Sequence, residues 1–96
     1  MKQNITYHQI PLFELGDLYA TRQIPEFLLT DEIVNLLRLH VHGQWGGLDP
    51  EDAADNHQGV RDGSRIFSSY YVRGRKIWVI TEADRSYTTV LFPSDY

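Results

Sequence analysis

The sequence predicts an α+β fold in which N-terminal helices pack on a small antiparallel meander sheet. Helix signals lie before Gly63, the hydrophobic periodicity changes after Asp62-Gly63, and the apolar runs that follow are separated by short turns. Helices followed by consecutive strands are typical of a sheet that carries its helices on one face. With 96 residues, the chain has the length of a single domain, residues 1–96, with a small core.

The segment before the first helix contains scattered apolar residues and one short strand candidate. Leu18-Tyr19-Ala20 follows the break at Gly16-Asp17 and fits an edge strand. The apolar side chains before that break, which can pack along the core, are Tyr7, Ile10, Leu12, Phe13 and Leu15.

Capping residues and apolar spacing predict the first two helices. Thr21 is placed as the N-cap of a short helix that ends near Leu29. Thr30 is placed as the N-cap of the second helix, because Asp31-Glu32 follow it where the helix dipole favours acids. Gly43 ends that helix as a left-handed cap. Its apolar face, at helical spacing, is formed by Ile33, Leu36, Leu37 and His40.

A glycine-rich loop separates the second helix from a third. Gly43-Gln44-Trp45-Gly46-Gly47 permits tight backbone angles, and Trp45 is expected to anchor the loop on the core. Asp49 and Pro50 then have the residue types of an N-cap and a first helical position. The third helix is expected to fade near Gly59.

Three strands are predicted after the turn at Asp62-Gly63, over residues 65–72, 76–81 and 87–92. Arg73-Gly74-Arg75 joins the first two as an antiparallel hairpin, and a polar turn joins the second to the third. In the middle strand, Ile77 and Val79 face one side, and Trp78 and Ile80 face the other. That strand is therefore covered on both faces, or on one face with a partner on the other.

The composition excludes several classes of site. The chain has no cysteine, so disulfides, thiolate nucleophiles and iron–sulfur clusters are ruled out. Its first six residues lack the apolar region of a signal peptide, and no apolar run has the length of a membrane span. We therefore expect a cytoplasmic protein that does not act at a membrane.

Charge is distributed unevenly along the chain, whose net charge is −4. Residues 1–60 carry three cationic side chains against nine carboxylates, and residues 61–85 carry six against three. Nonspecific nucleic-acid binders are usually basic overall, so direct nucleic-acid binding is not favoured, although the basic segment keeps it open.

A long pattern in this chain is formed by Gly43-Gln44-Trp45-Gly46, Asn56, Gly63-Ser64-Arg65-Ile66, Tyr70, the segment from Lys76 to Ser86 (KIWVITEADRS), Thr89-Val90-Leu91-Phe92-Pro93 and Tyr96. In this pattern the chain resembles a family of small bacterial plasmid- and phage-associated proteins of unknown function, sometimes labelled "plasmid-related". The similarity runs from about Leu18 to Tyr96 and implies a mobile-element origin without a mechanism. The family pattern usually has Asp in the Gly-x-Trp-Gly loop, where this chain has Gln44, so a role that depends on the Asp carboxylate is not carried over to this chain.

The predicted architecture is also similar to that of the barnase–EndoU–colicin–RelE group of small ribonucleases, so a metal-independent ribonuclease is one hypothesis. Such an enzyme needs proton transfer at the ribose hydroxyl and the leaving oxygen, and a cation for the phosphorane charge. His40 can transfer protons near neutral pH, and Arg65 or Arg85 can bind phosphate. The candidate catalytic residues are His40, Arg65, Tyr70 and Arg85. No spacing among them is diagnostic.

The leading hypothesis is a binding protein that modulates a host protein or nucleoprotein, including inhibition of a host defence system. Acidic stretches at 26–32 and 49–55 can meet a basic partner surface, and exposed aromatic residues often dominate binding energy. The candidate binding residues are Trp45, Trp78, Asp84, Arg85 and Tyr87. Neither a cofactor nor a metal is expected, because His40, His42 and His57 lack the spacing of a recognised metal site.

The polar turn Glu82-Ala83-Asp84-Arg85-Ser86 leaves two interpretations open. If Asp84 and Arg85 fold back onto the protein, the turn is scaffold; if Arg85 lies free beside Arg65 and Tyr70, it is a candidate site.

Overall fold

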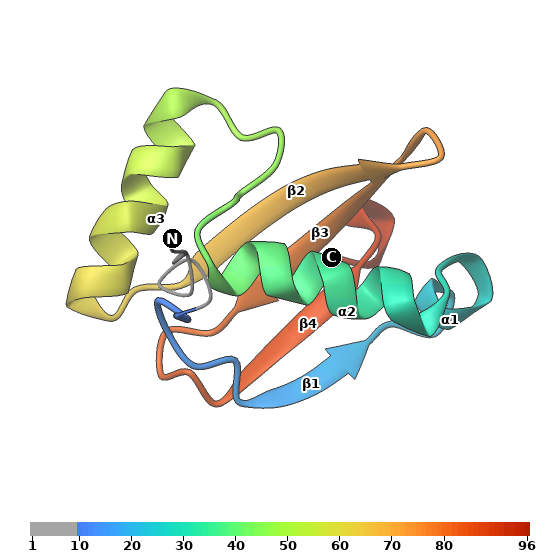
Figure 1. Cartoon of the computed structure of the whole chain (residues 1–96), viewed down its shortest axis with the longest axis horizontal. Coiled ribbons are helices and arrows are strands. Elements are labelled where there is room, and N and C mark those ends of the chain that lie inside the picture. The colour runs from blue at the N-terminus through green and yellow to red at the C-terminus, as the bar shows by residue number, and fades with distance from the viewer. Residues whose placement is uncertain (1–9) are drawn as a thin grey trace, which may run out of the picture.

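The computed structural model describes residues 10–96, and the α+β fold is confirmed within them (Figure 1). Three α-helices and a four-stranded sheet form the fold, and a short 3-10 helix follows the last strand. In chain order the elements are β1 (Asp17–Ala20), α1 (Ile24–Phe27), α2 (Thr30–Val41), α3 (Pro50–Asp62), β2 (Ile66–Val72), β3 (Arg75–Thr81), β4 (Tyr87–Leu91) and η2 (Pro93–Asp95).

The sheet has the strand order β1-β4-β3-β2. The predicted meander is confirmed: β2 pairs with β3 and β3 pairs with β4, both antiparallel. The β2–β3 turn is made by Arg73 and Gly74, whose φ angles of 48° and 79° are the left-handed values that a tight hairpin of this kind requires. The predicted edge strand also forms, but β1 pairs with β4 in parallel, so the sheet is mixed rather than wholly antiparallel. Because this pairing joins the two ends of the chain, no local turn signal could reveal it.

The N-caps predicted at Thr21 and Thr30 are wrong. The Thr21 hydroxyl instead donates a hydrogen bond to the Asp95 carboxylate at 2.7 Å, and α1 spans only one turn. Thr30 is the first residue of α2, and the backbone N–H of Leu29 is satisfied by the Glu32 carboxylate at 2.8 Å. A carboxylate at the third helical position thus stabilises the start of α2.

The start of α3 forms as predicted, but its end does not. Asp49 accepts a hydrogen bond from the backbone N–H of Asp52 at 2.9 Å. The helix continues past Gly59 and ends at Asp62, and Gly63, with a φ of 82°, caps it. A Cβ on Gly59 would lie 3.0 Å from the Ile66 Cδ1, so this glycine lets α3 pack closely on the first residue of β2.

Helix α2 covers one face of the sheet, and the core lies between them (Figure 1). The predicted apolar face is confirmed, because Leu36, Leu37 and His40 are buried and Ile33 packs beside them. The alternation predicted in β3 is confirmed as well: Ile77 and Val79 are fully buried on the helix side.

The predicted apolar packing of the N-terminal segment is only partly observed. Tyr7 lies outside the described residues, and Ile10 and Leu12 are exposed. Leu15 packs against the core, and the Phe13 ring lies 5.2 Å from the His40 ring, edge to face. Within residues 10–96, no helix has the length and apolar character needed to cross a bilayer.

Candidate functional site

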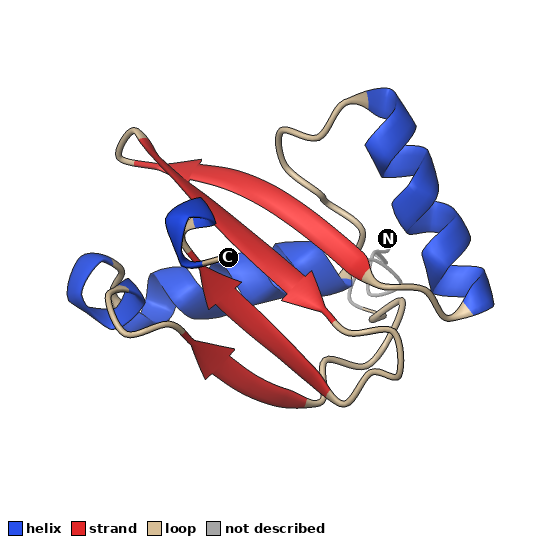
Figure 2. Cartoon of the chain, turned by 180° about the vertical axis from the view of Figure 1, so that it is seen from behind, coloured by secondary structure: helices blue, strands red, loops and turns tan. Residues whose placement is uncertain are grey.

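The sheet face opposite α2 carries a cluster of aromatic side chains. Strand alternation and the pairing registers place every second residue on this face, and Figure 2 shows it crossed only by η2 among the described elements. Four of its tyrosine side chains are exposed, from 40% for Tyr87 to 69% for Tyr96. We call this surface the aromatic face; its aromatic members are Tyr19, Phe67, Tyr71, Trp78, Tyr87 and Tyr96.

Ring contacts hold much of the aromatic face in place. Trp78 lies at the centre, with edge-to-face contacts to Phe67 at 5.0 Å and to Tyr96 at 5.8 Å between ring centroids. Tyr19 and Tyr87 make a similar contact at 5.7 Å across the β1–β4 pair. Such contacts fix the orientation of the rings in the free protein. Little side-chain entropy is therefore lost when a partner binds. The face therefore presents pre-oriented aromatic surfaces.

A shallow hollow of about 230 Å³ lies on the aromatic face beside Trp78. Its walls are largely apolar, with one cation at the edge. The lining residues are Arg65, Phe67, Trp78, Ile80 and Tyr96. A hollow of this size can take one side chain of a partner rather than a large ligand.

The cations of the aromatic face are engaged by neighbouring side chains. Arg65 donates a hydrogen bond to the Tyr96 hydroxyl at 2.6 Å and lies 3.7 Å from the Glu82 carboxylate. The Lys76 ammonium lies 5.6 Å from the centre of the Tyr71 ring. Charge is nearly balanced here, whereas a phosphate-binding surface needs an excess of cations.

His40, the candidate proton-transfer residue, lies in the core with no solvent exposure. Its Nδ1 hydrogen-bonds with the Ser68 hydroxyl at 2.6 Å and its Nε2 with the Thr81 hydroxyl at 2.9 Å. Burial, with a smaller contribution from the Arg85 charge, lowers the pKa of His40 to about 3. The ring is therefore neutral at physiological pH, and both its nitrogens are used inside the protein.

The other candidate catalytic residues do not converge with His40 on a shared surface. Tyr70 is buried on the helix side, donates its hydroxyl to the Gln44 carbonyl at 2.6 Å, and has a pKa raised by burial to about 12. Arg65 lies on the opposite face, in contact with Tyr96. Arg85 is held in the turn before β4. The structure thus gives the ribonuclease hypothesis no assembled catalytic group.

The turn from Glu82 to Ser86 folds back onto the protein, which matches the scaffold interpretation. Arg85 has a left-handed φ of 61° and donates to the carbonyls of Ser64 at 2.6 Å and Gly59 at 2.9 Å. It also reaches the carbonyls of Glu82 and Ala83 in its own turn. The Asp84 carboxylate accepts from the hydroxyl and the N–H of Ser86, which lowers the pKa of Asp84. Arg85 thereby ties the turn to the end of α3.

The candidate binding residues divide between surface and interior. Trp78 and Tyr87 belong to the aromatic face, whereas Trp45 is buried between the rings of Phe13 and His57. Trp45 anchors its loop, as predicted. The sequence analysis did not single out Tyr19 or Phe67; the alternation of β1 and β2, read with their strand partners, is the signal that adds them.

Within residues 10–96, no three His, Cys, Asp or Glu side chains lie close enough together to hold a metal ion. Comparisons with known protein families, with curated proteins and with solved structures found no match to this chain.

Proposed function

We propose that this protein is a binding module of mobile-element type, which modulates a host protein or nucleoprotein by engaging it through the aromatic face. The observation that carries the proposal is an open sheet face on which aromatic side chains stay exposed although every α-helix of the described chain lies elsewhere. Tyrosine and tryptophan are the residue types most enriched among interface hot spots.

Charge favours a protein surface over bare nucleic acid as the direct contact. The cations Arg65 and Lys76 on the aromatic face are accompanied by Glu82 and Asp17, and the whole chain is acidic. Nucleic-acid binding draws much of its free energy from several cations that contact phosphates. A partner that presents an apolar surface with a polar rim fits better.

The mobile-element origin and the host target rest on the sequence resemblance described above. A small protein from such an element can act by occupying a functional surface of a host protein, including a component of a defence system. This mode of action needs shape and charge complementarity and no catalytic group.

The experiment is capture of partners from a bacterial host lysate on the immobilised full chain, followed by affinity measurement for each saturable partner. Tyr87→Ala and Tyr19→Ala are expected to weaken binding by about tenfold or more each, because interface tyrosines often act as hot spots. The matched control is Val34→Ala, since Val34 is an exposed apolar residue on α2, away from the aromatic face. Failure to recover a saturable partner, or equal loss with the control, would count against the proposal.

A further inference from the structure

The outer edge of β2 is covered along most of its length. Alternate residues of this edge strand direct their N–H and C=O groups away from β3. At Phe67 both groups bond to the Asn56 side chain, at 3.0 and 2.6 Å. At Ser69 both groups bond to the backbone of the glycine-rich loop, through Trp45 at 3.0 Å and Gly47 at 2.7 Å.

Tyr71 is the next outward-facing position, and no described residue bonds to its outward N–H and C=O. The strand pairing confirms this orientation, because Val72 and Arg75 close the two-residue turn as a bonded pair. The edge of β2 therefore offers one donor and one acceptor in the extended geometry that another strand would use.

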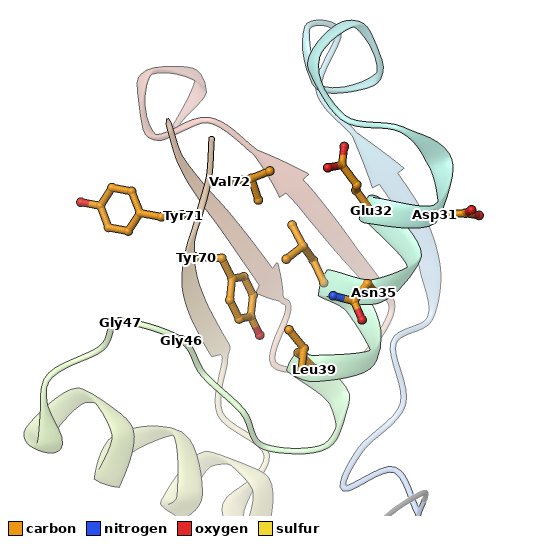
Figure 3. Close-up of a pocket in the computed structure, with 10 residues that line it drawn as sticks. Asp31, Glu32, Asn35, Leu39, Gly46, Gly47, Tyr70, Tyr71 and Val72 are labelled. Atoms are coloured by element: carbon orange, nitrogen blue, oxygen red, sulfur yellow. The ribbon is translucent and has the colours of Figure 1, made fainter. Parts of the chain in front are cut away.

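A groove lies directly beside this open stretch of edge. Figure 3 shows α2 on one side and β2 on the other, with the Gly46–Gly47 backbone closing one end. Its volume is about 480 Å³, and Leu36, Leu39, Tyr70 and Val72 supply its apolar walls. The Tyr71 side chain points away from the groove, so this residue contributes backbone to it.

The lining of the groove is acidic. It contains the carboxylates of Asp31 and Glu32 and no lysine or arginine side chain. Arg73, at the far end of the groove, forms a salt bridge with the Glu32 carboxylate and donates a hydrogen bond to the Phe27 carbonyl. Asp31 also lines the groove, and its carboxylate forms no salt bridge with another described residue.

We propose that this groove binds an extended, basic polypeptide segment of a partner by strand addition at Tyr71. The segment continues the line of the Trp45–Gly47 backbone along β2 and exchanges hydrogen bonds with the Tyr71 N–H and C=O. One apolar side chain enters the groove, and neighbouring lysine or arginine side chains face the acidic rim. Strand addition at a sheet edge, with a pocket for alternate side chains, is an established mode of peptide recognition.

This inference goes beyond the proposed function, because the groove opens at the sheet edge and does not use the side chains of the aromatic face. The proposal for the aromatic face and the proposal for the groove can therefore be tested separately. Tyr87→Ala and Tyr19→Ala are expected to leave peptide binding at the groove unchanged. Failure of the groove test would leave the aromatic face as the only proposed surface.

The experiment selects peptides of about ten random residues, a length suited to strand addition, on the immobilised full chain. The deciding pair of variants is Tyr71→Pro and Tyr71→Ala. Both remove the same side chain, but only proline removes the outward N–H, and proline is tolerated on edge strands where that N–H faces solvent. A second variant, Asn35→Trp, fills the groove from an exposed position on α2 without altering β2.

Selected peptides are expected to carry an apolar residue flanked by lysine or arginine. Their affinity should fall about tenfold with Tyr71→Pro and with Asn35→Trp, and stay within about twofold with Tyr71→Ala. Circular dichroism establishes that each variant is folded; if Tyr71→Pro is not, Asn35→Trp decides alone. The proposal is overturned if no peptide is enriched, if acidic peptides are enriched, or if binding survives both groove variants. A dimer of the wild-type chain in sedimentation that Tyr71→Pro dissociates would assign the edge to a second copy and would also overturn it.

Discussion

His40 and Arg85, both singled out as candidate catalytic residues, are each tied down by hydrogen bonds within the protein. His40 links α2 to β2 and β3 through the hydroxyl groups of Ser68 and Thr81. The Thr81 hydroxyl also hydrogen-bonds with the Thr88 hydroxyl at 2.6 Å. The Thr88 hydroxyl donates to the Leu15 carbonyl at 2.7 Å. A buried polar network of this kind costs stability when any member loses its partner.

The pKa of His40 predicts how the stability of the protein depends on pH. An unfolded chain gains a proton at His40 near the ordinary pKa of 6.5, whereas the native protein does not until about pH 3. Protonation between these values favours the unfolded state. The free energy of unfolding attributable to His40 is therefore fully present above about pH 6.5, and it should fall by at most about 1.4 kcal/mol per pH unit below that. Urea unfolding at a series of pH values measures the slope.

The control for this prediction is His40→Gln, which keeps hydrogen-bonding groups but does not titrate. Its unfolding free energy should fall less steeply than that of the wild type between about pH 6.5 and 5. The carboxyl groups with lowered pKa values, Glu32, Asp62 and Asp84, release their protons in both proteins at lower pH than this window. Equal slopes for the two proteins would contradict the neutral, buried state of His40.

Arg85→Ala tests the scaffold role of the polar turn. Loss of the bonds to the Ser64 and Gly59 carbonyls should lower the free energy of unfolding by about 2 kcal/mol, because hydrogen bonds from charged groups are stronger than neutral ones. The matched control is Arg61→Ala on the exposed side of α3, which should change stability by no more than about 0.5 kcal/mol. If both variants are equally stable in urea unfolding, Arg85 is not structural.

Among the elements, α3 and β2 show what the sequence could predict and what it could not. The strands and the start of α3 follow from local signals, namely alternation, Asp49 and Pro50, and were predicted to within a residue or two. The continuation of α3 past Gly59 depends on contact with Ile66, and the parallel β1–β4 pair depends on residues far apart in sequence. Local patterns carry no information on such contacts.

The candidate site was predictable to a similar degree. Trp78 and Tyr87 were identified because they are aromatic residue types that often dominate binding energy at interfaces. Tyr19 was not, because its place beside Tyr87 requires the β1–β4 register. His40 was placed on the correct helix face, but its hydroxyl partners come from two strands, so its buried role required the structure.

Asn56→Ala tests how α3 covers the edge of β2. The Asn56 side chain is buried and satisfies both outward backbone groups of Phe67. Its loss should destabilise the protein by about 2 kcal/mol and speed hydrogen exchange at the Phe67 amide. Asn35→Ala, at an exposed position, serves as the control. Slow exchange at Phe67 in the Asn56 variant would show that another group protects this edge.

The molecule as a whole presents two surfaces of different character. Helix α2 lies on one side of the sheet, with the groove at the β2 edge, and the aromatic face lies on the other side (Figures 1 and 2). A radius of gyration of 13.5 Å puts both within reach of a single large partner. An interface of standard size covers about 800 Å² on each protein, so the aromatic face and the groove together could belong to one assembly or serve two partners.

Site-specific photo-crosslinking in bacterial cells tests the aromatic face most directly. A photoreactive phenylalanine analogue would replace Tyr87 or Tyr19 on the aromatic face, or Val34 on the exposed side of α2 as the matched position. We expect a discrete crosslinked partner from the two tyrosine positions and none from position 34. Crosslinks from position 34 alone, or no crosslink from either tyrosine position, would contradict the assignment of the aromatic face as the binding surface.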